Sequence, residues 1–141
     1  MSNQVEPLRV LVVDDDVDAA QSLCLLLQAM GCRAAATHDP ANGLALAVEF
    51  EPELAIIDLE MPGMKGTEMV QHLRLQHAST VAMAVCLTGH RIPENQRSTG
   101  NAAFDAFITK PIVADALVGI LNQTNKLARS SPSRTRTRRL G

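Results

Sequence analysis

Aromatic residues and paired cysteines are scarce in this sequence. The chain has no Trp or Tyr, only three Phe, and three cysteines that form no Cys-x-x-Cys pair. A metal site built on cysteines is therefore not expected, and Cys24, Cys32 and Cys86 are predicted to be small core residues in a reducing compartment. With so few aromatic rings, Leu, Val, Ile, Ala and Met must build the hydrophobic core.

Long apolar runs and targeting signals are also missing. No stretch approaches the roughly 20 apolar residues of a membrane helix. The opening MSNQVEPLRV lacks the basic region and apolar core of a signal peptide, so we expect a cytoplasmic protein without membrane contact. The 141 residues, 46% hydrophobic and 20% charged, suit one globular domain.

Charge is distributed unevenly along the chain. Residues 126–141 carry six basic residues and no acid, whereas the remainder holds seven basic residues and all 15 acids. The final SSPSRTRTRRLG also lacks apolar periodicity. We therefore predict an N-terminal tail over 1–7, a folded domain over 8–126 and a disordered basic tail over 127–141, with solvation of the tail favoured over nucleic-acid binding.

Short apolar runs alternate with amphipathic segments. Strands are predicted over 8–13, 32–37, 53–57, 81–87 and 105–109, and helices over 18–31, 39–50, 67–76, 93–101 and 111–126. The helix over 93–101 is the weakest, since it has no large apolar residue. Such alternation predicts an α/β fold, a doubly wound five-stranded parallel sheet with five helices.

Local signals mark several helix ends and faces. Asp39 with Pro40 is typical of a helix start, and Gly31 of a helix end. Asp16 and Asp18 are interpreted as caps, Asp18 forming a capping box with Gln21. Residues 19, 23, 26 and 30 are predicted to form the buried face of the first helix, and Val113, Leu117, Ile120 and Thr124 that of the last.

Polar residues gather where the predicted strands end. Asp14 and Asp15 follow the first strand, Asp58 the third, Thr88 the fourth and Lys110 the fifth. Carboxyl ends of parallel strands share one sheet edge, where doubly wound folds place their ligands. Three acids there call for a compensating cation such as Mg²⁺. Asp58 is predicted to attack phosphorus as a nucleophile, with Lys110 and Thr88 receiving the phosphoryl charge.

The motifs VLVVDDD, IIDLEMPGMKG, LTGH and DAFITKP resemble the receiver domain of bacterial two-component response regulators, over about residues 8–125. The resemblance implies a flavodoxin-like sheet with strand order 2-1-3-4-5. It also implies that Asp58 is the phosphoacceptor and that Asp14, Asp15, Asp58 and the Glu60 carbonyl are the Mg²⁺ ligands. Lys110 would be the site lysine, and Thr88 and Phe107 the switch residues. Glu60 and His90 would tune dephosphorylation.

The resemblance also implies partners. A histidine kinase or histidine phosphotransfer protein would supply the phosphoryl group from a phosphohistidine. A downstream protein would bind the fourth helix, last strand and last helix, with Val118 and Leu121 as apolar contacts, and a homodimer is left open. The chain would be a self-phosphorylating and autodephosphorylating switch, not a turnover enzyme.

Two alternatives and two departures accompany this interpretation. The chain is alternatively a receiver module of a hybrid histidine kinase. A haloacid-dehalogenase-type phosphatase is disfavoured, because Glu60 stands where that family needs a second Asp and because Asp14 and Asp15 precede Asp58. The departures from the receiver pattern are Lys65, where an acid is common, and Ala103, where Gly is usual, so Gly100 or Asn101 would take the turn.

Overall fold

The computed structural model describes residues 6–59, 61–76, 79–89 and 104–129. Strands and helices alternate along them in this order: β1 (Arg9–Val13), α1 (Val17–Ala29), β2 (Arg33–Thr37), α2 (Pro40–Phe50), β3 (Leu54–Asp58), α3 (Gly66–Leu75), β4 (Met83–Thr88), β5 (Ala106–Thr109) and α5 (Ala114–Arg129). All five predicted strands are present, and four of the predicted helices. The helix predicted over 93–101, and the turn at Gly100, Asn101 and Ala103, lie outside the described residues.

The five strands form one parallel sheet in the order β2-β1-β3-β4-β5, which confirms the predicted topology. Val13 pairs with Ile57 and with Thr37, and Thr88 pairs with Thr109. The carboxyl ends of all five strands therefore meet at one edge of the sheet.

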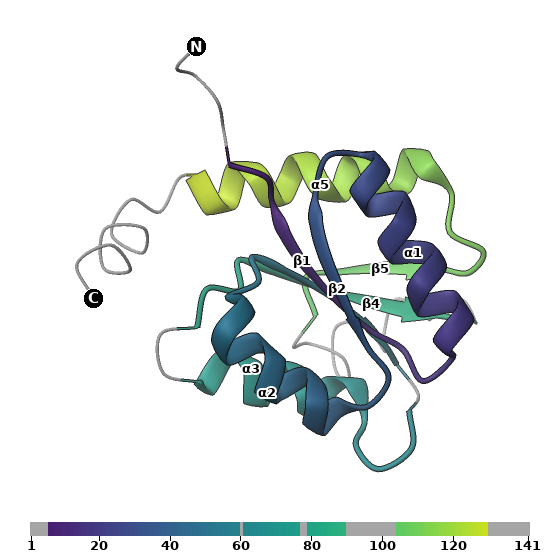
Figure 1. The fold of residues 1–141 in the computed structure, drawn as a ribbon, viewed down its shortest axis with the longest axis vertical. Helices are drawn as coiled ribbons and strands as arrows, with labels where there is room; N and C mark the ends of the chain where they lie inside the picture. The colour runs from purple at the N-terminus through teal and green to yellow at the C-terminus, as the bar shows by residue number, and fades with distance from the viewer. Residues whose placement is uncertain (1–5, 60, 77–78, 90–103, 130–141) are drawn as a thin grey trace.

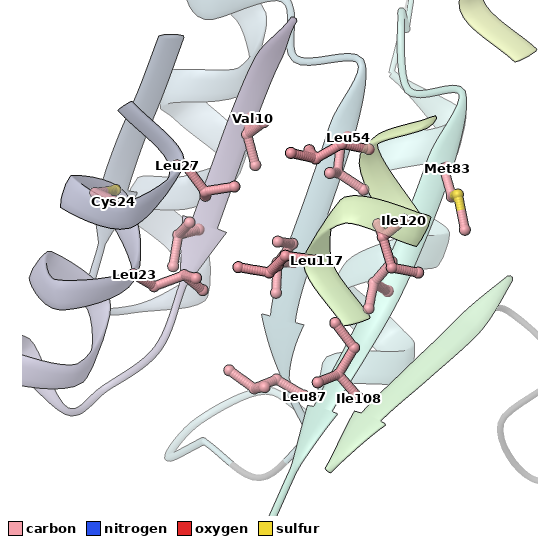
Figure 2. Packing of buried hydrophobic residues seen from close by; sticks show 14 of the residues in the cluster. Val10, Leu23, Cys24, Leu27, Leu54, Met83, Leu87, Ile108, Leu117 and Ile120 are labelled. Atoms are coloured by element: carbon pink, nitrogen blue, oxygen red, sulfur yellow. The ribbon is translucent and has the colours of Figure 1, made fainter. Parts of the chain in front are cut away.

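Helices cover both faces of the sheet, α1 and α5 on one and α2 and α3 on the other (Figure 1). Side chains alternate across β1, so that Val10 and Val12 join the core under α1 and α5, and Leu11 and Val13 join the core under α2 and α3. Figure 2 shows the first of these cores, where Leu23 and Leu27 of α1 and Leu117 of α5 meet the strands. Burial on both faces explains why the strands are unbroken apolar runs.

The start of α1 confirms one of the two predicted caps and corrects the other. Asp16 is the N-cap, with extended backbone and a side chain that accepts a hydrogen bond from the N–H of Ala19 at 3.1 Å. Asp18 lies inside the first turn, so a capping box from Asp18 to Gln21 is wrong. Asp16 caps the helix because its side-chain oxygen accepts a hydrogen bond from an amide of the first turn that has no partner within the helix.

The buried faces of two helices are also corrected. In α1 the buried residues are Ala20, Leu23, Cys24 and Leu27. Of the predicted residues, Leu23 belongs to this stripe, and Leu26 and Met30 pack against the same core while partly exposed. In α5 Leu117, Ile120 and Thr124 are buried as predicted. Val113 is 58% exposed because it precedes the first helical residue, Ala114.

Helix α5 extends beyond the predicted domain boundary. It continues through Leu127 and Ala128 to Arg129, and Ala128 is buried. The predicted start of the disordered tail at residue 127 is therefore wrong, and the rest of that tail, 130–141, lies outside the described residues. Packing against the sheet, together with the polar contacts of Arg129, carries the helix three residues past Lys126, whereas the composition of the tail suggested an earlier end.

Arg129 joins an ionic cluster at the amino-terminal edge of the sheet. Its guanidinium lies 3.8 Å from the Glu53 carboxylate and donates to the Glu6 carbonyl at 3.0 Å. Arg9 lies 3.9 Å from the same carboxylate, and both Arg9 and Glu53 are buried. The end of α5 is therefore attached to β1 and to the residue before β3.

The two residues predicted to contact a downstream partner lie beside the end of α1. Leu121 is buried, and Val118 is 44% exposed. Both line a groove of about 330 Å³ together with Met30, Gly31 and Cys32 at the end of α1. Both residues thus border the end of α1, and their contact with a downstream partner stays a prediction. Within the described part of the chain, no helix has the length and apolar character needed to cross a membrane.

Candidate functional site

Three carboxylates converge at the carboxyl edge of the sheet. Asp14 and Asp15 follow β1, Asp58 ends β3, and these two strands are neighbours. One oxygen of each carboxylate lies within 4.8 Å of the others. Asp14 and Asp58 are buried, whereas Asp15 is exposed. The predicted acidic cluster is thus present, with one of its members open to solvent.

Backbone contacts hold Asp14 in place. Its N–H donates to the carbonyl of Thr37 at 3.1 Å, which continues the pairing of β1 with β2. Its Oδ1 accepts from the N–H of Asp16 at 3.0 Å, and its carbonyl lies 3.4 Å from Nδ1 of His38. The carboxylate is therefore oriented before any ligand arrives, with its Oδ2 toward the amine of Lys110.

Lys110 brings a positive charge to the acids from the end of β5. Its Nζ lies 3.5 Å from Oδ2 of Asp14 and 3.8 Å from Oδ2 of Asp58. The Lys110 N–H donates to the carbonyl of Thr88 at 2.8 Å, so the lysine is placed by the pairing of β4 and β5. The amine offsets part of the repulsion between the carboxylates.

Thr88 and Phe107 take the strand positions expected of them. Thr88 is buried at the end of β4, next to Leu87, which pairs with Asp58 of β3. Phe107 lies in the edge strand β5 and pairs with Cys86. Glu60 and His90 lie outside the described residues.

Cys86 lies in the strand beside the phosphoacceptor candidate, a placement that the sequence did not single out. Complete burial, together with the negative charge of Asp58, raises the pKa of the Cys86 thiol to about 12. The thiol is therefore protonated and inert at neutral pH, which agrees with its prediction as a core residue.

Gly66 was also missed, although it is closer to the site. A methyl group on its Cα would lie 2.8 Å from the carbonyl oxygen of Asp58 and 3.3 Å from Cα of Leu59. The first residue of α3 thus packs directly against the backbone of Asp58. A glycine at the start of a helix, where it is a poor helix former, was the available signal.

Lys65, the departure noted in the sequence, occupies the N-cap position of α3. Its side chain caps nothing, but its backbone N–H donates to Oε1 of Glu68 at 3.1 Å. A carboxylate in the first turn offsets the unfavourable cation at this helix end. The helix therefore begins on half a capping box, supplied by Glu68.

Relatives of known type share most of the chain. The sensor histidine kinase AtsR of Burkholderia thailandensis is 33% identical over 117 residues, which are 82% of this chain and 19% of AtsR. The transcriptional regulatory protein PrrA of Mycobacterium tuberculosis is 35% identical over 119 residues, 84% of this chain and 50% of PrrA. The chain thus spans about a fifth of one relative and half of the other.

Solved structures and family models agree with these relatives. The response regulator TrrA of Thermotoga maritima, solved in complex with Mg²⁺–BeF, matches with a TM-score of 0.70 and 26% identity over 83% of this chain and 98% of TrrA. The model of the response regulator receiver domain matches residues 10–122. This match favours the receiver prediction over the dehalogenase-type alternative. With its parallel sheet, its converging acids and its lysine, the chain belongs to the response regulator receiver domain family, the signalling switches of two-component systems.

Proposed function

We propose that this receiver domain takes a phosphoryl group from a phosphohistidine onto Asp58. The observation that carries the proposal is the meeting of Asp14, Asp15 and Asp58 with Lys110 at one sheet edge. Oδ of Asp58 forms a bond to phosphorus while the phosphorus–nitrogen bond of the donor breaks. The electron pair of that bond stays on the imidazole, which takes up a proton from solvent, and Asp58 becomes an acyl phosphate.

The residues present fit a magnesium ion. Carboxylate oxygens are the ligands that Mg²⁺ prefers, and an ion that retains several waters needs few of them from the protein. Asp14, Asp15 and Asp58 would hold it. By the resemblance to receiver domains, the Glu60 carbonyl would be a further ligand. When bound, the ion supplies positive charge opposite the phosphoryl oxygens. The structure of TrrA was solved with Mg²⁺ and a beryllium fluoride, which supports the same chemistry here.

Lys110 and Thr88 are proposed to receive the phosphoryl group. The amine of Lys110, 3.8 Å from Asp58 Oδ2, would pair with a phosphoryl oxygen, and the Thr88 hydroxyl would donate to another. Drawing Thr88 toward the phosphoryl group would free space for the ring of Phe107, whose two positions would shift the surface read by a partner. Water attack on phosphorus would end the signal by releasing phosphate, at a rate tuned by Glu60 and His90.

A cleft beside the acids supports a protein donor. It has a volume of about 280 Å³ and is lined by Asp14, Ala19, Ser22, Leu23, Leu26, Leu87, Lys110, Pro111 and Ile112. Its walls are mainly apolar side chains of α1 and of the segment after β5, with two charged groups at the end nearest Asp58. A kinase or phosphotransfer protein would place an apolar contact there and its phosphohistidine over Asp58. The relative AtsR is a sensor histidine kinase, which supports the alternative that this chain is a receiver module of a hybrid histidine kinase.

A phosphodonor assay tests the proposal. The protein is incubated with acetyl phosphate and Mg²⁺, and its intact mass is measured. We expect a gain of one phosphoryl group that disappears when the metal is chelated and in Asp58→Asn. Asp39→Asn is the matched control, because Asn also caps α2 and Asp39 lies outside the site. Phosphorylation that persists in Asp58→Asn would disprove the assignment.

A further inference from the structure

Phe104 is one of only three Phe in the chain, and the proposed function gives it no role. It lies two residues before the start of β5 at Ala106 and is 6% exposed. Its ring centroid lies 5.9 Å from that of Phe107, with an angle of 59° between the planes. This is a tilted aromatic contact of the favourable kind. The proposed switch ring of Phe107 therefore rests against a second, buried ring.

The same ring reaches the turn that follows Asp58. A methyl group on Gly66 would lie 3.3 Å from Cζ of Phe104, as well as 2.8 Å from the Asp58 carbonyl. The Gly66 N–H donates to the carbonyl of Leu59 at 3.1 Å, which closes the turn. The backbone of Asp58 and the Phe104 ring thus both border the space that a side chain at Gly66 would occupy.

The backbone beside Phe104 is firmly attached. Oδ2 of Asp105 accepts from Arg74 at 2.7 Å and from the Ala84 N–H at 2.8 Å, and the Asp105 N–H donates to the Ala84 carbonyl at 2.8 Å. Arg74 belongs to the last turn of α3, and Gly66 is its first residue. Both ends of α3 therefore contact the two residues before β5.

We propose that Phe104 is a positioning residue that couples the turn after Asp58 to the ring of Phe107. Its neighbour Asp105 is held by Arg74 and Ala84, so a displacement of the turn at Gly66 is taken up by rotation of the Phe104 ring. In a core packed at crystal-like density, that rotation moves the ring it touches, Phe107. This inference rests on the proposed phosphorylation of Asp58, and adds a second route to Phe107 beside the one through Thr88.

The three phenylalanines give a direct readout. Protein grown with ring-¹³C phenylalanine shows only the signals of Phe50, Phe104 and Phe107, which are assigned with single Phe→Leu variants. Spectra are recorded before and after addition of Mg²⁺ and beryllium fluoride, and intact mass after acetyl phosphate is measured in parallel. In the wild-type chain we expect the Phe104 and Phe107 signals to move together. Movement of Phe107 with a stationary Phe104 would overturn the inference without any substitution.

Phe104→Leu tests the coupling itself. We expect the variant to gain the same phosphoryl mass at a rate within twofold of wild type, while the shift of the Phe107 signal falls to less than half. Phe50→Leu, at the end of α2 and away from these contacts, is the control and should leave the Phe107 shift unchanged. A full Phe107 shift in Phe104→Leu overturns the inference. Absence of any mass gain in the wild-type chain would instead refute the proposed function.

Discussion

Nζ of Lys110 lies 3.5 Å from Oδ2 of Asp14, a carboxylate that is 1% exposed although its partner is 35% exposed. The lysine also lies 3.8 Å from Oδ2 of Asp58, so it is close to two of the three acids, which are brought together by strands far apart in the chain. Charges of one sign at this spacing destabilise the fold unless a cation lies among them.

We therefore predict that Lys110→Met lowers the free energy of unfolding in metal-free buffer by about 1–2 kcal/mol. This is less than the loss for a fully buried pair, because solvent screens the lysine. Urea denaturation at pH 7 measures the change, and Lys65→Met at the exposed start of α3 is the control. Equal losses in the two variants would mean that the amine of Lys110 does not stabilise the acids.

Asp15→Asn is expected to weaken Mg²⁺ binding by roughly 10-fold, because it removes one of three anionic ligands. Mg²⁺ would then stabilise the variant about 1.4 kcal/mol less than the wild type at the same high concentration of the ion. Denaturation with and without Mg²⁺ measures this difference. Asp16→Asn is a close control, since it keeps a capping side chain one residue away. The metal assignment fails if Asp15→Asn responds to Mg²⁺ as the wild type does.

A chain that ends at Arg129 is expected to keep the full stability of the 141-residue protein, whereas one that ends at Leu127 should lose about 1–2 kcal/mol. The shorter chain lacks the buried Ala128, the hydrogen bond of Arg129 to the Glu6 carbonyl and its ion pair with Glu53. Urea midpoints of the two truncated chains and the full chain decide the matter. Equal stability of the two truncated chains would show that Ala128 and Arg129 contribute nothing to the stability of the fold.

Cys86 predicts a loss of stability at alkaline pH. Its pKa is about 12 in the fold and is raised from 9.0, so the unfolded thiol loses its proton first as the pH rises. The native chain then binds more protons than the unfolded chain, and the contribution of Cys86 decreases between pH 9 and 12. Between pH 9 and 11 the stability of the wild type relative to Cys86→Ala should fall by about 2 kcal/mol. Urea denaturation of both proteins at several pH values measures this change. A constant difference in stability between the wild type and Cys86→Ala from pH 9 to 11 would contradict the burial of an uncharged thiol beside Asp58.

Local pattern predicted the helices and strands of the described residues and the polar residues that gather at the edge of the sheet. Buried parallel strands are apolar runs, so β1, β3 and β4 were visible as runs, and Asp39 with Pro40 marked the start of α2. Asp14, Asp15, Asp58 and Lys110 were identifiable because a polar residue at the end of such a run belongs to the edge where parallel strands end together. The strands and helix starts depend on residues that are close in the chain. The site depends on the rule that the carboxyl ends of parallel strands meet at one edge of the sheet.

Only tertiary packing decided the rest. The sequence does not distinguish the buried Asp14 from the exposed Asp15, because their burial depends on Lys110 and on the pairing of β1 with its neighbours. The end of α5 at Arg129 depends on Glu53 and Glu6, more than 70 residues away in the sequence. The contact of Gly66 with Phe104 likewise joins two segments that share no local signal. Composition and periodicity report which residues are apolar and how they repeat, whereas distances between remote side chains are set by how the helices pack on the sheet.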